Sequence, residues 1–255
     1  MKLRSYRGAL LATLLTVSSC AVASPPNPFK IPEANIKAKV KVVALAPLNL
    51  GSEFEDPQSI QTKFESLIET KLREGGFTVV PSKEYAAIWK QMTETLGGVF
   101  DPISGKRDEA KLKMVREHTV RELASKNRAD AVLYSGMGAV KANFNAGRAK
   151  WHGTAEYIVT GGFWGALAAG NTYGTIPAVS LFVSLTDLNG VDMYVNAGGV
   201  QALSKLSGRN FTTVPRHELF TDEDRNRHAL NIALNPLLGK PTPEEDPQPA
   251  TPTAR

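Results

Sequence analysis

Two spacings of apolar residues alternate along the first part of the chain. Residues 40–47 are β-rich and apolar and end in a proline, which predicts a buried strand. The next apolar residues recur at helical spacing between charged positions and predict an amphipathic helix that ends at Gly75 and Gly76. These apolar residues are Ile60, Phe64, Leu67, Ile68 and Leu72. Residues 77–81 are a second strand pattern, so the order strand, helix, strand favours a parallel pair.

The middle of the chain adds two helices and a third strand. Ser82 is expected to cap a helix whose apolar face is Tyr85, Trp89, Met92 and Leu96. Asp108 is expected to open another helix, with its inward positions running from Leu112 to Leu123. Residues 129–140 form the third strand pattern.

From residue 143 onward the pattern is typical of hairpins. A turn is expected over residues 143–148, a strand over 149–159, and a strong strand over 178–186. Asp187 to Gly190 form a hairpin turn that leads to a partner strand over 192–202. The last helix is expected over about 222–238, ended or bent by Pro236. The fold class is therefore an α/β (α+β) sandwich, in which a mixed sheet has a βαβ start followed by antiparallel hairpins and helices pack on the sheet.

The first residues indicate export. Three cations lie within the first seven positions, and an apolar run of about ten residues follows, as in a secretory signal peptide. The run is too short to span a bilayer, which needs roughly 20 apolar residues. We therefore expect residues 1–19 to be a signal peptide.

Cys20 follows this run directly and is the single cysteine of the chain. Val17, Ser18 and Ser19 before it resemble the lipobox of bacterial lipoproteins, which implies diacylation of the Cys20 thiol and cleavage before it. Several acyl chains make stable anchoring plausible where one would be marginal. The alternative is ordinary secretion with cleavage after Ala23, which would leave a soluble periplasmic protein.

The resemblance also implies a location. Residue 21 is Ala rather than Asp, and by similarity to sorting in Gram-negative bacteria this favours the periplasmic face of the outer membrane. The expected organisation is a signal peptide (1–19), a lipidated cysteine with a proline-rich tether (20–37), a single α/β domain (38–239) and a disordered proline-rich tail (240–255).

Charge argues against a nucleic-acid partner. Removing the signal peptide removes three cations and no acid, so the formal net charge falls from +5 to +2. A nucleic-acid binder would instead gather Lys and Arg on one face.

The strand patterns resemble those of a group of envelope lipoproteins. The resemblance rests on residues 42–48, on the Gly76–Pro81 strand (GFTVVP) and on the strand over 129–136 (ADAVLYSG). The group includes the curli-secretion channel lipoprotein and penicillin-binding-protein activator lipoproteins, and it implies an α/β fold like that of the TolB N-terminal domain. These motifs are core strands, so they imply a fold rather than a ligand or a catalytic residue.

No residue pattern predicts an enzyme, a cofactor or a metal site. The four histidines, His118, His152, His217 and His228, do not stand at metal-ligand spacing with one another or with acids. The nucleophile-elbow pattern Gly-x-Ser-x-Gly and the phosphate-binding P-loop are also absent.

Residues 161–174 are the most unusual internal segment, because aromatic residues lie among glycines with no charge. They predict either a loop folded back on the core or an apolar contact surface formed by Phe163, Trp164, Leu167 and Tyr173. The favoured function is a non-catalytic, periplasm-facing lipoprotein that binds or helps to assemble another cell-envelope component. The alternatives are an oligomeric subunit of an export channel and an enzyme of unknown type.

Overall fold

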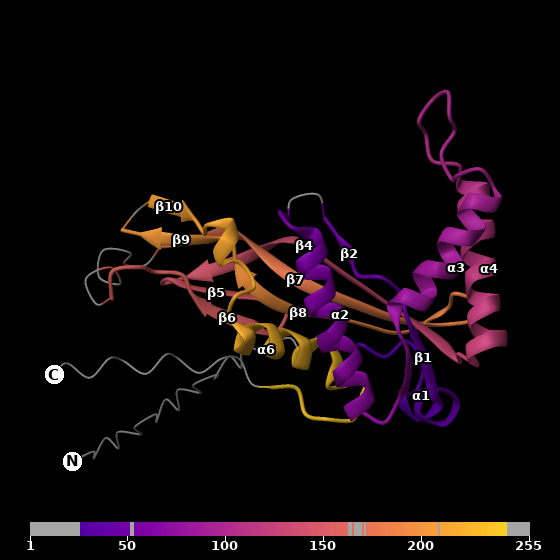
Figure 1. The fold of residues 1–255 in the computed structure, drawn as a ribbon. Coiled ribbons are helices and arrows are strands. Elements are labelled where there is room, and N and C mark those ends of the chain that lie inside the picture. Colours follow the sequence, from indigo (N-terminus) through magenta and orange to yellow (C-terminus); the bar gives the residue numbers. More distant parts are fainter. Residues whose placement is uncertain are drawn as a thin grey trace, which may run out of the picture.

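The computed structural model describes residues 26–51, 54–162, 165, 170, 172–208 and 210–243. Figure 1 shows a long, curled sheet with helices packed against it. The helices are α1 (Glu33–Lys39), α2 (Pro57–Glu74), α3 (Ser82–Thr95), α4 (Glu109–Asn127), the 3-10 helix η1 (Arg216–Glu218) and α6 (Glu223–Leu234). The strands are β1 (Val42–Leu45), β2 (Asn49–Leu50), β3 (Thr78–Val80), β4 (Ala131–Asn145), β5 (Arg148–Trp151), β6 (Thr154–Tyr157), β7 (Tyr173–Asp187), β8 (Asp192–Ala202), β9 (Ser204–Ser207) and β10 (Asn210–Thr213). No helix in these described ranges has both the length and the apolar character needed to cross a membrane.

The first part of the sheet is parallel. β1 pairs in parallel with β3 on one side and with β4 on the other. Helix α2 connects β1 and β2 to β3, and its N-cap residue is Asp56, whose carboxylate accepts a hydrogen bond from the N–H of Ser59. The expected βαβ start is confirmed.

The second part of the sheet is built from antiparallel hairpins. β4 and β7 are each 15 residues long and pair along their whole length, from Ala131 opposite Asp187 to Asn145 opposite Tyr173. The turn from β7 to β8 is closed by the Asp187 carboxylate, which accepts the N–H groups of Asn189 and Val191. Gly190 follows at φ 81°, a left-handed conformation that suits glycine. The mixed α/β fold class is confirmed.

The end of the sheet curls over on itself. The last residues of β4 pair with β5, and β5 pairs with β6. The hydroxyl of Thr154 in β6 then donates to the carbonyl of Gly199 in β8 at 2.7 Å. The curl encloses a second apolar cluster of Ala142, Phe144, Ala149, Trp151, Ile158, Ile176, Ala178, Ala202 and Leu206.

Both faces of the parallel part are covered. Val43 and Leu45 of β1 pack in the cluster that includes residues of α2 and α6, whereas Ala44 packs in the cluster that includes residues of α3 and α4. Successive side chains of a strand point to opposite faces, so the two helix pairs lie on opposite sides of β1. This is why residues 40–47 read as a continuous apolar run rather than as an alternating one.

The fold begins earlier than the proline content predicted. Residues 33–39 form α1, in which Ile36 is buried, and Phe29 packs its ring against Tyr194 at 5.2 Å. Pro32 precedes the first helical residue, where a missing N–H group costs no intrahelical hydrogen bond. The prediction of an extended tether is therefore wrong for residues 33–37, which are helical, whereas residues 28–30 are extended and pair with β8.

Three local predictions are also wrong. Pro81, not Ser82, holds the N-cap of α3, because the Ser82 hydroxyl donates instead to the Glu65 carboxylate. The strand expected over residues 149–159 is broken into β5 and β6 by His152 and Gly153, which both have positive φ. Residues 204–213, where no strand was expected, form the separate two-stranded sheet of β9 and β10.

Candidate functional site

Tyr173 is the described member of the predicted apolar contact surface. Its side chain is 83% exposed at the first residue of β7. Cys20, Phe163, Trp164 and Leu167 lie outside the described residues. The contact surface therefore stays a prediction, with one exposed aromatic residue in place.

A second exposed aromatic residue lies at the same end of the sheet. Phe211 in β10 is 51% exposed and packs edge-on against the Phe144 ring at 5.7 Å. Phe144 pairs in the β4–β7 ladder with Gly174, the neighbour of Tyr173. We call Phe144, Tyr173 and Phe211 the aromatic end, which lies toward β9 and β10 in Figure 1. Sequence reasoning missed Phe211, although the Asn-Phe-Thr-Thr stretch of β10 has a weak strand preference.

The loop between α3 and α4 projects from the other end of the molecule (Figure 1). At its tip Ile103 is 96% exposed, and Phe100 is 55% exposed. The Asp101 carboxylate accepts the N–H groups of Ser104 at 2.6 Å and of Ile103 at 3.0 Å. The hydrogen bonds from Ser104, the largest cause, and from Ile103 lower the pKa of Asp101. These bonds close the turn that presents Ile103.

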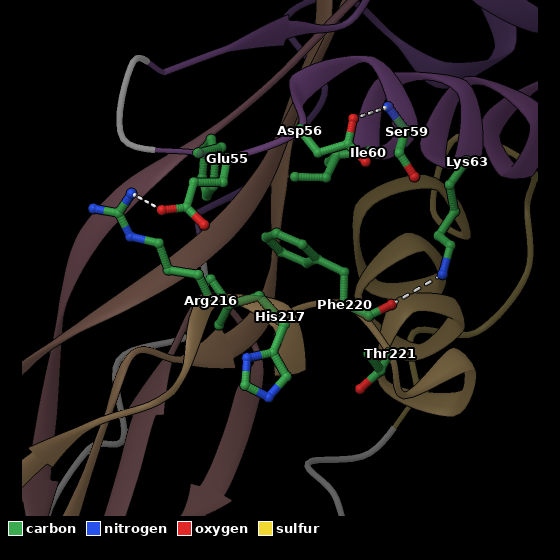
Figure 2. Close-up of a pocket in the computed structure, with 11 residues that line it drawn as sticks. Glu55, Asp56, Ser59, Ile60, Lys63, Arg216, His217, Phe220 and Thr221 are labelled. Atoms are coloured by element: carbon green, nitrogen blue, oxygen red, sulfur yellow. Dashed lines mark hydrogen bonds and ion pairs between the residues drawn. The ribbon is translucent and has the colours of Figure 1, made fainter.

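A pocket of about 390 Å³ lies between the start of α2 and residues 216–221 (Figure 2). We call it the α2 pocket. Phe54, Ile60, Leu219 and Phe220 supply its apolar lining, and its polar lining is Glu55, Asp56, Ser59, Lys63, Arg216, His217 and Thr221. An ion pair of 2.6 Å joins Arg216 to Glu55. A pocket that combines an apolar wall with several charged and polar groups suits an amphipathic side chain or a small polar ligand.

The α2 pocket is built around a strained residue. Phe220 has φ 62°, which costs a bulky residue about 1–3 kcal/mol. Its N–H donates to the Gln201 side chain at 3.1 Å. Its carbonyl accepts from the Asn226 amide at 2.9 Å and from Lys63 Nζ at 3.1 Å. Asp56, on the same pocket, also has a positive φ of 49°. Strained residues of this kind persist only where neighbouring groups hold them, so the pocket has a defined shape.

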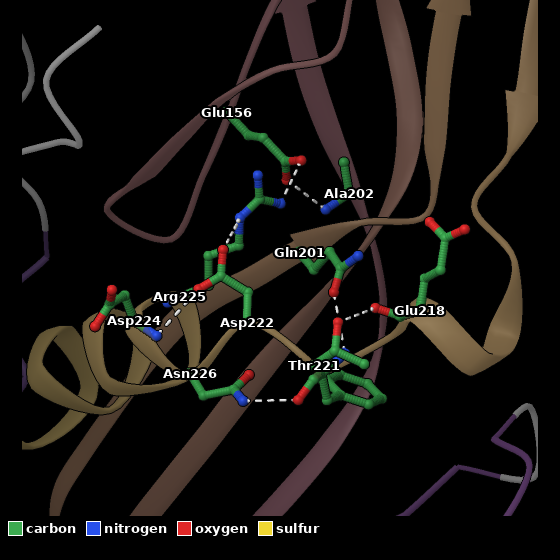
Figure 3. Close-up of polar contacts among 10 residues, drawn as sticks. Glu156, Gln201, Ala202, Glu218, Thr221, Asp222, Asp224, Arg225 and Asn226 are labelled. Atoms are coloured by element: carbon green, nitrogen blue, oxygen red, sulfur yellow. Dashed lines mark hydrogen bonds and ion pairs between the residues drawn. The ribbon is translucent and has the colours of Figure 1, made fainter. Parts of the chain in front are cut away.

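An ion pair beside this pocket holds α6 to the sheet (Figure 3). Glu156 in β6 has a side chain only 7% exposed, and its Oε1 lies 2.6 Å from Arg225 Nη1 of α6. Its second oxygen accepts the N–H of Ala202 at 2.8 Å. Arg225 also contacts Asp222, the N-cap residue of α6. The ion pair therefore fixes the start of α6 and the segment that leads into it.

The histidines do not form a common site. Within the described ranges, no group of three or more His, Cys, Asp or Glu side chains gathers as metal ligands. His217 is highly exposed, and its Nε2 lies 3.9 Å from the Glu218 carboxylate. His152 is half-buried, its Nδ1 lies 2.7 Å from Ser180 Oγ, and burial lowers its pKa. The absence of a catalytic or cofactor role stays a prediction.

No protein-family model matches the chain, and no curated protein matches it. Among solved structures, a dodecamer of a PelC point variant from Paraburkholderia phytofirmans is similar at 15% sequence identity and a TM-score of 0.35. That likeness covers 79% of this chain and 91% of the other. A TM-score this low establishes neither a shared fold nor a shared function.

Proposed function

We propose that the chain is a non-catalytic lipoprotein, anchored through Cys20 at the periplasmic face of the outer membrane, that binds another component of the cell envelope. The signal-peptide pattern of residues 1–19 and the lipobox-like residues before Cys20 support the anchor. The binding role is supported by the exposed apolar side chains of the folded domain.

The aromatic end carries the binding part of the proposal. Tyr173 and Phe211 come from parts of the chain that are far apart in sequence, yet both are exposed at one end of the sheet. Aromatic side chains are enriched among the residues that dominate protein interfaces, because they bury a large area with little loss of side-chain entropy. Tyr173 stands on the rigid ladder of β4 and β7, so little order has to be gained on binding.

Site-specific crosslinking in the intact cell envelope tests this proposal. A photoreactive phenylalanine analogue replaces Tyr173 or Phe211 in the full-length protein, and Lys90 serves as a control. Lys90 is well exposed on α3, away from the aromatic end. We expect the same crosslinked partner from positions 173 and 211 and none from position 90. A lack of adducts at 173 and 211, or the same adduct at all three positions, would contradict the proposal.

A second candidate is an oligomeric subunit of an export channel. It is favoured by the two exposed apolar features at opposite ends of the molecule, the aromatic end and the Ile103 loop tip (Figure 1). A head-to-tail contact between such features generates a ring or a filament. Native mass spectrometry of the detergent-solubilised protein separates the candidates: a ring of many copies supports the channel subunit, and a monomer or dimer supports the binding protein.

A further inference from the structure

The outer edge of β8 is covered at one end by the start of the described chain. The N–H of Val195 donates to the carbonyl of Pro28, and the N–H of Lys30 donates to the carbonyl of Met193, both at 2.9 Å. Phe29 forms an antiparallel bridge with Tyr194. The strand addition stops at Pro28, because proline has no N–H to offer the next carbonyl.

The same edge is covered at its other end by the β5–β6 turn. The N–H of Gly199 donates to the carbonyl of His152 at 3.1 Å, and the carbonyl of Gly199 accepts from the Thr154 hydroxyl at 2.7 Å. His152 has φ 37°, and its ring is fixed by Ser180 at 2.7 Å and by an edge contact with Phe182 at 5.5 Å. These contacts hold the β5–β6 turn in place over Gly199 at the edge of β8.

Ala197 lies between the two covered ends. In an antiparallel ladder, alternate residues direct their N–H and C=O groups to opposite edges. Met193, Val195 and Gly199 use the outer edge, so Ala197, which has the same parity, directs its groups there too. Among the described residues, no backbone group outside the β7–β8 ladder bonds to Ala197.

A cavity of about 460 Å³ opens at this point of the edge. Its lining is largely apolar and includes Pro28, Phe182, Val195, Ala197, Ile232 and Pro236. We call this cavity the Ala197 notch. Within the described part of the chain, the notch therefore combines apolar walls with one strand residue whose backbone N–H and C=O have no backbone partner.

We propose that the Ala197 notch binds an extended segment of the partner protein. One residue of that segment pairs its backbone with Ala197, and its apolar side chain lies against Phe182 and Val195, on the face of β8 that Ala197 shares with them. Addition of a strand to an exposed sheet edge is an established mode of peptide recognition, in which backbone bonds give affinity and side-chain pockets give specificity. This edge already accepts backbone pairing on both sides of the notch, which favours a peptide over a purely apolar ligand. The inference rests on the proposed binding function and names the partner's chemistry.

Peptide selection tests the inference. A displayed library of random eight-residue peptides is selected on the mature chain carrying Cys20→Ala, and affinities are measured by fluorescence polarisation. The test variant is Ala197→Pro, which removes the outward N–H and leaves the ladder with β7 intact, since proline is tolerated on edge strands. The control is Leu188→Pro, in the first central position of the β7–β8 turn, where proline is favoured.

We expect enriched peptides to share an apolar residue, and their affinity to fall at least tenfold in Ala197→Pro but not in Leu188→Pro. Equal affinity for Ala197→Pro, or no enriched peptide, would overturn the inference. Protection of the Ala197 amide from hydrogen exchange in the free protein would also overturn it, because a segment of the same chain would then fill the notch. None of these results alters crosslinking from positions 173 and 211, so the proposed function is tested separately.

Discussion

The ion pair between Glu156 and Arg225 makes a quantitative prediction about stability. Glu156 is nearly inaccessible, and its carboxylate has two partners, Arg225 Nη1 at 2.6 Å and the N–H of Ala202 at 2.8 Å. Removing one partner of a fully buried ion pair costs about 3–5 kcal/mol, because the other charge is left without compensation. The Arg225 side chain is 35% exposed, so water compensates part of that loss. We therefore expect Arg225→Ala to destabilise the protein by about 2–3 kcal/mol.

Glu156→Ala should cost a similar amount for a different reason. It leaves the N–H of Ala202 buried without an acceptor, which costs about 1–3 kcal/mol, while Arg225 keeps its contact with Asp222. The double variant should cost less than the two single costs combined, since neither charge is then left alone.

Urea unfolding followed by circular dichroism measures these costs on the mature chain carrying Cys20→Ala. With a slope of about 2 kcal/mol per molar urea, the single variants should lower the midpoint by about 1 M. Lys90→Ala is the matched control, because its ion pair with Glu94 is 3.8 Å long and well exposed and should contribute under about 0.5 kcal/mol. If Arg225→Ala lowers the midpoint no further than Lys90→Ala does, the ion pair does not hold α6 to the sheet and the reasoning is wrong.

Three further predictions concern other parts of the chain. Gly198→Ala should lower the free energy of unfolding by about 1–3 kcal/mol or more, because a Cβ there would meet the Ala229 carbonyl oxygen at 2.0 Å. Gly174→Ala should cost less, because its Cβ would meet only the edge of the Phe144 ring at 3.1 Å. Equal costs for the two variants in urea unfolding would refute the close approach of α6 to β8. Partial burial lowers the pKa of His152 below its ordinary 6.5, so the unfolded chain takes up the proton first and stability should fall as the pH drops through 6.5 toward the folded-state pKa. His152→Asn, which tolerates the positive φ, should show a smaller loss of midpoint between pH 8 and pH 5, and an unchanged loss would exclude His152 as its source. Cys20→Ala should move the protein from the membrane fraction to the soluble periplasm, and retention on membranes would refute the lipid anchor.

Much of the fold could be predicted from local pattern. The apolar residues of α2 lie on one face of the helix, and Phe64, Ile68 and Leu72 are all buried, as their spacing predicts. The turn at Asp187 forms where the sequence predicts it, because its closing hydrogen bonds come from residues two and four positions later. Strand β8 likewise has the bounds expected from its pattern.

The missed features depend on contacts between distant segments. α1 forms because Ile36 finds a place in the core, although the prolines around it predict an extended chain. β5 and β6 separate at His152 because the curl of the sheet brings this turn against Gly199 of β8. Neither contact leaves a periodic signal in the nearby sequence, since its partner lies far along the chain.

The candidate sites also divide into those that the sequence indicates and those that depend on contacts between distant segments. The sequence by itself determined which segments bury one face, because that pattern depends only on the period of a helix or strand. The sequence also singled out Cys20 and Tyr173 as candidate functional residues. Only the tertiary structure decided that Phe211 lies beside Phe144 and that Phe220 is held in a strained conformation. It also decided that no described segment pairs with the outer edge of β8 at Ala197. Each of these features depends on how segments that are far apart in the sequence pack or pair with one another. The residues next to each feature in the sequence do not specify that packing.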